Sequence, residues 1–126
     1  MPAQRSPVTR LGSVIRLAPG AEKEYRRLHA AVWPGVLARL GEAHVTNYTI
    51  FHHGDMLFAY MEYLGDDLES DMARVDADPE TQRWLALTDP LQSRLQTAAD
   101  GDRWWATMEE IFHYAGVCSE DTAAPV

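Results

Sequence analysis

The stretch EYRRLHAAVWP, from Glu24 to Pro34, decides how the rest of the chain is interpreted. At helical period its apolar residues share one face, and that face also carries His29. Tyr25 and Trp33 lie one turn before and one turn after this histidine, because side chains four apart on a helix are neighbours. Pro34 has no N–H group, so we expect a kink or break just after Trp33.

Two interpretations of His29 follow from this stretch. A histidine walled by aromatic rings suits a small proton-transfer site, because the imidazole exchanges protons near neutral pH. A histidine on an apolar face is also commonly a core residue whose two ring nitrogens are hydrogen-bonded. The stretch alone does not separate the two interpretations.

Composition narrows the class of protein. The 126 residues predict a single domain over 1–126, with an ordered core at about 9–114 between a loose N-terminal extension and a loose C-terminal tail. The net charge of −8 argues against a nucleic-acid or membrane partner and favours a neutral small molecule such as a carbohydrate. Cys118 stands alone, so no intramolecular disulfide forms, which is consistent with the cytoplasm. We find neither a membrane-spanning apolar run nor the apolar core of a signal peptide.

The order of the expected elements predicts the fold. Strand, helix, strand, strand, helices and strand is the ferredoxin-like split βαβ pattern, an α+β sandwich with a four-stranded antiparallel sheet. Pro90 is expected to break or kink the last helical stretch. The expected strands are Thr9–Leu17, His44–His52, Met56–Leu64 and Trp104–Tyr114, and the expected helices are Ala21–Leu40, Asp66–Ala77 and Pro79–Leu95.

The strand after the hairpin turn, Met56–Leu64, is apolar on both faces. Helices cover one face of the sheet in this fold, so the other face needs a second cover. We therefore expect a homodimer in which two sheets pack together.

The chain resembles the L-rhamnose mutarotase family of sugar anomerases, which are dimeric α+β barrels. The resemblance extends from about Leu11 to Tyr114 and rests on five motifs in order. They are EYRRLHAAVWP at 24–34, NYTIF at 47–51, LFAYMEY at 57–63, QRW at 82–84 and MEEIFH at 108–113.

The resemblance implies an isomerase that interconverts the α and β anomers of L-rhamnose or a related deoxy-sugar without cofactor or metal. It implies that His29 is the catalytic proton donor and that Tyr25 and Tyr48 contact the sugar. It also makes Trp84 the first of two pocket tryptophans, whereas the second position is Leu85 here. That departure leaves the sugar open, with L-fucose as the next substrate to try.

Several further residues have roles that the sequence leaves open. Trp33 is expected to line the substrate pocket, and the pair Trp104-Trp105 compensates for Leu85 if it reaches that pocket. Glu62 in an apolar strand indicates a pocket or dimer contact, while Asn47 faces the opposite side of its strand from Tyr48 and reads as structural. The roles of Glu109 and Glu110 stay undecided.

The sequence also excludes sites. The remaining histidines lack zinc-ligand spacing, no glycine-rich phosphate loop is present, and no serine has a nucleophile-elbow setting. Two alternatives to a mutarotase stay open. The same barrel hosts cofactor-independent monooxygenases and polyketide cyclases, and it also serves as a non-enzymatic barrel that binds a small molecule.

Overall fold

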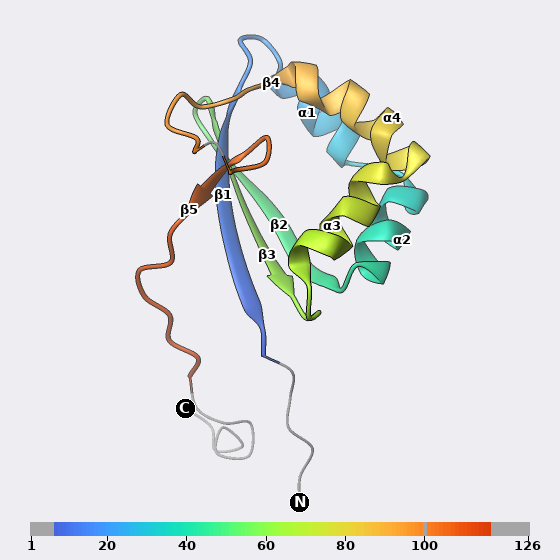
Figure 1. The fold of residues 1–126 in the computed structure, drawn as a ribbon. Coiled ribbons are helices and arrows are strands. Elements are labelled where there is room, and N and C mark those ends of the chain that lie inside the picture. Colours follow the sequence, from blue (N-terminus) through green and yellow to red (C-terminus); the bar gives the residue numbers. More distant parts are fainter. Residues whose placement is uncertain (1–6, 100, 117–126) are drawn as a thin grey trace, which may run out of the picture.

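The computed structural model describes residues 7–99 and 101–116 (Figure 1). The expected loose ends lie largely outside these residues, and so does Cys118. The strands are β1 (Thr9–Leu17), β2 (Val45–His53), β3 (Met56–Tyr63), β4 (Gln92–Ser93) and β5 (Ala106–Met108). The helices are α1 (Glu22–His29), α2 (Pro34–Glu42), α3 (Leu68–Ala77) and α4 (Pro79–Thr88), with a short 3-10 helix η1 (Asp89–Leu91).

The sheet has the strand order β2-β3-β1-β4, and all its pairs are antiparallel. This order confirms the predicted α+β fold of the split βαβ type. Two short strands share the position of the expected fourth strand beside β1. β4 pairs with the C-terminal end of β1, and β5 pairs with its middle. The prediction of one long last strand over Trp104–Tyr114 is therefore wrong: pairing is limited to Ala106–Met108, and residues 109–116 form no ladder within this chain.

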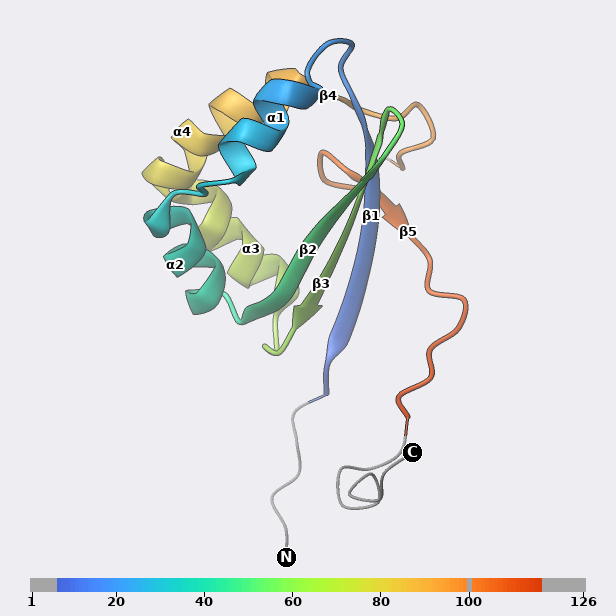
Figure 2. The ribbon, with the colours of Figure 1, turned by 180° about the vertical axis from the view of Figure 1, so that it is seen from behind.

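The four helices lie together on one side of the curled sheet (Figures 1 and 2). Side chains alternate along β3 as expected, since Leu57, Ala59 and Tyr63 are buried beneath the helices. Phe58 and Tyr60, which point the other way, are only partly buried. The helical layer thus covers one face of the sheet.

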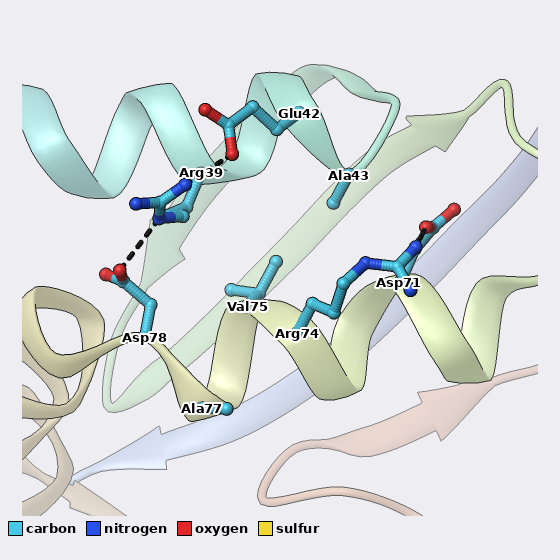
Figure 3. A pocket seen from close by; sticks show the side chains of 8 residues that line it. All are labelled: Arg39, Glu42, Ala43, Asp71, Arg74, Val75, Ala77 and Asp78. Atoms are coloured by element: carbon cyan, nitrogen blue, oxygen red, sulfur yellow. Dashed lines mark hydrogen bonds and ion pairs between the residues drawn. The ribbon is translucent and has the colours of Figure 1, made fainter.

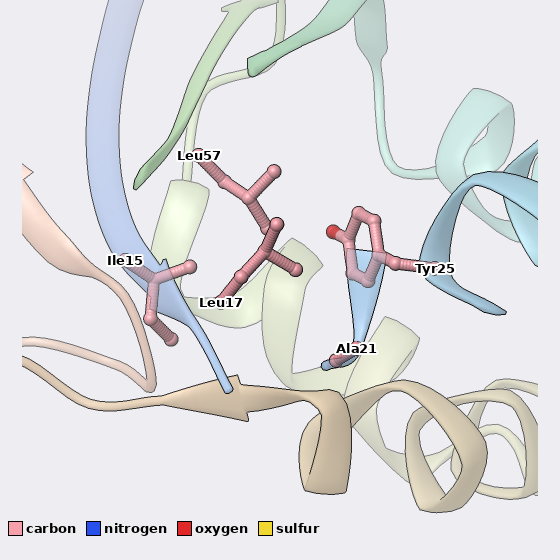
Figure 4. Close-up of a cluster of buried hydrophobic side chains, with 5 residues drawn as sticks. All are labelled: Ile15, Leu17, Ala21, Tyr25 and Leu57. Carbon is pink, nitrogen blue, oxygen red and sulfur yellow. The ribbon is translucent and has the colours of Figure 1, made fainter. Parts of the chain in front are cut away.

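The core between sheet and helices contains the first candidate site residue. Tyr25 of α1 packs against Ile15 and Leu17 of β1 and Leu57 of β3, as Figure 4 shows. A second cluster joins α1, α2 and α4 through Leu28, Val36 and Trp84. Both clusters hold α1 in place, so the helix that carries His29 rests on two independent contacts.

The expected helix over Ala21–Leu40 is divided earlier than predicted. α1 ends at His29, and α2 begins at Pro34 rather than continuing through it. Trp33 is extended, at φ −62° and ψ 134°, because a residue before proline is sterically excluded from the helical region. Pro34 then starts the new helix at a position where its missing N–H costs nothing. The break thus leaves His29 in the last turn of a short helix.

The expected break at Pro90 is confirmed, but the chain does not resume a helix after it. α4 ends at Thr88, and η1 leads directly into β4. Leu91 and Leu95, which we expected on the helix, lie after its end. Gln92 is consequently a strand residue beside α1. No helix among the described residues is long and apolar enough to cross a membrane.

Candidate active site

Three aromatic rings, from α1, α4 and the segment between α1 and α2, gather beside His29. The Tyr25 ring stacks on the imidazole with centroids 4.2 Å apart and planes 25° apart. Trp84 meets His29 edge-on at 5.3 Å, and Trp33 meets Trp84 in the same manner at 5.4 Å. The structure therefore brings together the predicted catalytic residue and three of the predicted binding residues.

One hydrogen bond determines which nitrogen of His29 is free. Its Nδ1 lies 2.9 Å from the backbone oxygen of Tyr25, one turn earlier in α1. A carbonyl oxygen can only accept, so Nδ1 carries a proton and donates it. The exchangeable position is therefore Nε2, which accepts a proton in the neutral ring and donates one in the charged ring. The imidazole is only partly buried, so Nε2 belongs to a ring that solvent or a ligand reaches.

The hydroxyl of Tyr25 is held by a residue that sequence reasoning missed. Gln92 of β4 donates from Nε2 to this hydroxyl at 3.1 Å, and Oε1 of Gln92 accepts from the indole Nε1 of Trp104 at 2.8 Å. Burial raises the pKa of the Tyr25 hydroxyl well above its ordinary value, against the lowering effect of the bond from Gln92. Tyr25 is thus a neutral hydrogen-bonding group across the whole physiological range.

A β-bulge in β2 explains how Tyr48 approaches the same place. The register with β3 shifts between Thr46 and Thr49, and Asn47 has a positive φ of 51°. Asn47 turns its amide to Glu62 on the outer face of the sheet at 2.7 Å. Tyr48 lies near enough to Tyr25 to contribute to the raised pKa of that hydroxyl. Burial likewise raises the pKa of the Tyr48 hydroxyl, although 45% of the whole residue is exposed.

Asp89 is a second residue that the sequence analysis did not select. It follows α4 directly, at the start of η1, and is partly buried. Among the described residues it has no ion pair and no side-chain hydrogen bond. Its burial raises its pKa, and its charge in turn raises the pKa of the Tyr25 hydroxyl. A carboxylate that is partly desolvated and lacks a cation is the kind of group that active sites use.

The remaining residues that were predicted to bind substrate are more buried or reach the site only indirectly. Trp84 is 6% exposed and belongs to the cluster between α1, α2 and α4, so it offers His29 an edge. Leu85 packs partly against the same cluster. Trp105 packs against the cluster around Tyr25, while Trp104 reaches the site through Gln92.

Three of the other polar residues of the sequence analysis, Asn47, Glu62 and Glu110, have structural partners. Glu62 accepts from Asn47 and from the hydroxyl of Tyr60, which lowers its pKa. Glu110 pairs with Arg10 at 2.7 Å, which lowers the pKa of the glutamate. Within residues 7–99 and 101–116, no three metal-binding side chains gather into a possible metal site.

A cavity of about 310 Å³ lies elsewhere, between α2 and α3 (Figure 3). Two arginines and three carboxylates contribute to its lining, and Arg39 pairs there with Asp78 at 2.7 Å and with Glu42. It contains none of the aromatic residues around His29. Its lining consists of Arg39, Glu42, Ala43, Asp71, Arg74, Val75, Ala77 and Asp78. We call it the ionic pocket.

Comparison with known proteins identifies the family. The family model described as L-rhamnose mutarotase matches residues 10–114. An L-rhamnose mutarotase of Phocaeicola vulgatus is 32% identical over 77% of this chain and 89% of its own. An L-fucose mutarotase of Xanthomonas campestris is 36% identical over 64% of this chain and 67% of its own.

Solved structures share the fold. The L-rhamnose mutarotase of Formosa agariphila has a TM-score of 0.63 at 22% identity, over 84% of this chain and 98% of that one. Tetracenomycin F2 cyclase of Streptomyces glaucescens has a TM-score of 0.64 at 14% identity, over 86% of this chain and 99% of that one. The fold alone thus does not choose between mutarotase and cyclase, whereas the sequence matches do. The chain belongs to the L-rhamnose mutarotase family, as its motifs predicted, and is an isomerase of the sugar mutarotase kind.

Proposed function

We propose that this protein interconverts the α and β anomers of L-rhamnose with His29 as the proton donor and without a cofactor. The observation that supports His29 most directly is the hydrogen bond from its Nδ1 to the Tyr25 carbonyl. This bond leaves Nε2 as the one ring position that exchanges a proton. The family match supports the reaction class, and the substrate named for the relatives supports the sugar.

The reaction needs two proton transfers in each direction. In ring opening, the charged imidazole of His29 gives the Nε2 proton to the ring oxygen while the C1–O5 bond breaks. The anomeric hydroxyl loses its proton to a base, and C1 becomes a carbonyl carbon. After rotation about C1–C2, the two transfers run in reverse and the ring closes on the other face. Positioned acids and bases each accelerate such steps by about 10²–10⁴-fold.

We assign the base to Asp89. Its charge raises the pKa of the Tyr25 hydroxyl, and no cation among the described residues neutralises it. The raised pKa makes the carboxylate a better proton acceptor than an ordinary aspartate. His29 and Asp89 then exchange one proton each with the sugar, so that the net charge of the site returns after every cycle.

The aromatic and tyrosine side chains supply the binding surface. Tyr25 and Tyr48 are neutral donors for sugar hydroxyls, because burial raises both of their pKa values. Trp33 and Trp84 form an apolar wall beside His29, against which the C–H surface of the sugar packs. Leu85 takes the place of the second tryptophan of the family's pair, so this wall lacks the indole at that position, and we expect the change to affect which deoxy-sugar is preferred.

Saturation-transfer NMR on L-rhamnose at anomeric equilibrium tests the proposal, since it reports exchange between the two anomeric protons directly. Exchange that appears with the wild-type protein and is lost in His29→Ala supports it. Unchanged exchange in that variant removes His29 from the mechanism. If the protein exchanges the anomers of L-fucose but not those of L-rhamnose, the proposed substrate is corrected to L-fucose. We would then ascribe this preference to the wall that contains Leu85. If the protein exchanges the anomers of neither sugar, neither one is its substrate and the proposal is overturned.

We further propose that the protein works as a homodimer in the cytoplasm. Large apolar side chains are open on the side of the sheet that no described helix covers, including Phe51 at 59% exposed. Ile111 and Phe112 after β5 are 95% and 82% exposed. Such a surface is costly for a monomer and suits a partner of the same kind. Light scattering of Phe112→Glu tests this: dissociation is expected, and a wild-type monomer at micromolar concentration contradicts it.

A further inference from the structure

The hydrogen bonds that join Trp104, Gln92 and Tyr25 run in one direction. An indole N–H can only donate, so the atom of Gln92 that faces it at 2.8 Å must be the amide oxygen. The amide nitrogen of Gln92 consequently faces the Tyr25 hydroxyl, and it donates to that oxygen at 3.1 Å. Trp104 therefore determines the polarity of the chain as far as Tyr25.

This polarity leaves the hydrogen of the Tyr25 hydroxyl free for another acceptor. The phenol oxygen accepts from Gln92, so its own hydrogen cannot lie in that same bond. Within residues 7–99 and 101–116, that hydrogen has no hydrogen-bond acceptor. Both Tyr25 and Gln92 are buried, which makes an unused donor costly unless a ligand takes it.

We propose that Gln92 and Trp104 are positioning residues that hold Tyr25 as a hydrogen-bond donor to an oxygen of the sugar. This inference rests on the proposed mutarotase function and adds the direction of one contact. The sugar group at Tyr25 must be an acceptor, and a deoxy position there loses the bond. His29 stacks on the same phenol ring, so an oxygen bound by Tyr25 lies close to the imidazole that transfers the proton.

Gln92→Glu reverses the polarity with little change of shape. A carboxylate still accepts from the indole of Trp104, but its second oxygen also accepts, so it takes the hydrogen of the Tyr25 hydroxyl. The donor then points away from the sugar. We expect kcat/KM for L-rhamnose exchange to fall by roughly 10-fold to 100-fold, the usual effect of losing one buried hydrogen bond.

A double-mutant cycle separates positioning from damage to the fold. Tyr25→Phe keeps the ring that stacks on His29 and removes only the hydroxyl. In that background Gln92→Glu has no hydroxyl to redirect, so we expect it to change kcat/KM by less than about 2-fold. An equally large loss in both backgrounds overturns the proposal, because a merely structural role of Gln92 gives that result.

Indole NMR tests the relay without any activity. Trp104→Phe assigns the Nε1–H resonance of Trp104, and Gln92→Leu is expected to shift it upfield because the acceptor is lost. An unmoved resonance overturns the relay even if the enzyme is active. If the Trp104 resonance shifts as expected in Gln92→Leu but the wild-type protein does not exchange sugar anomers, the relay stands. The proposed function and the contact with the sugar are then overturned. The two failures are therefore distinguishable.

Discussion

The aromatic site and the ionic pocket place their carboxylates in opposite environments. In the pocket, Arg39 holds the pKa of Asp78 below its ordinary value of 3.8, and the Tyr63 hydroxyl does the same for Asp71. At the aromatic site, burial raises the pKa of Asp89. The pocket therefore stabilises its carboxylates as ions, whereas the aromatic site disfavours the ionised form.

The two environments differ in how well they suit proton transfer. A carboxylate held by arginine or by strong donors has little tendency to accept a proton near neutral pH. A desolvated carboxylate without a cation is a stronger base, and it costs stability to keep it ionised. The detected cavity thus lies beside carboxylates that the fold stabilises as ions, whereas the proposed chemistry lies beside a carboxylate whose ionised form is disfavoured.

The largest effect is expected for His29→Asn. The substitution keeps a polar side chain at the end of α1 but removes the nitrogen that transfers the proton. We expect kcat/KM for anomer exchange to fall by about 10²–10⁴-fold. The matched substitution in the ionic pocket, Asp78→Asn, should leave exchange nearly unchanged. Comparable losses in the two variants contradict the assignment of chemistry to the aromatic site.

Asp89→Asn should move activity and stability in opposite directions. The variant lacks the base, so exchange is expected to slow by about 10²-fold. Ionisation of a group whose folded pKa is raised costs stability above that pKa, so removing the charge should raise Tm at pH 7. The gain should vanish as the pH falls below the ordinary pKa of aspartate, where the wild-type residue is protonated in both states. A lower Tm at pH 7 contradicts this prediction.

The fold and half of the site were predictable from local patterns. Helical spacing placed Tyr25 and His29 on one side, and the strand alternation of β3 was confirmed. Trp33 was expected one turn further along the same helix, but it lies in the segment between α1 and α2 and packs on Trp84. These features depend on residues close together in the chain. The division of the expected helix at His29 was missed by four residues, because the effect of Pro34 on the residue before it was weighed less than its effect on the preceding turn.

Gln92 and Asp89 were not predictable from the same patterns. Gln92 is 67 positions from Tyr25, and only the end of α4 and the pairing of β4 with β1 bring them together. Apolar spacing through Leu91 and Leu95 favoured a helix there, and nothing in that pattern distinguished the glutamine between them. The break at Pro90 was the one signal that this segment leaves the helix. Asp89 lies directly before that proline, and the sequence pattern did not distinguish it.

Acid should weaken the ionic pocket, because its carboxylates stabilise the fold only while they are ionised. Asp71 and Asp78 have lowered pKa values in the folded state, so their stabilisation is present above pH 3.8 and is lost as the pH falls through the folded values. We expect the urea midpoint to drop below about pH 4, and to drop less steeply in Asp71→Asn. Equal slopes in both proteins contradict a role of Asp71 in the acid dependence.

The smallest effect is expected for Arg39→Gln, which changes the ionic pocket and leaves the aromatic site intact. Arg39 is exposed, and its bonds to Asp78 and Glu42 are partly screened by water, so Tm should fall by only a few degrees, about 5 °C at most. Asp78 keeps its hydrogen bond from the backbone N–H of Thr81, which preserves the start of α4 and hence the position of Trp84. Anomer exchange should therefore stay within about 2-fold of wild type, because additive effects are expected for sites without shared contacts. A large loss of exchange in this variant requires that the two regions are coupled through α4, and the ionic pocket is then part of what positions His29.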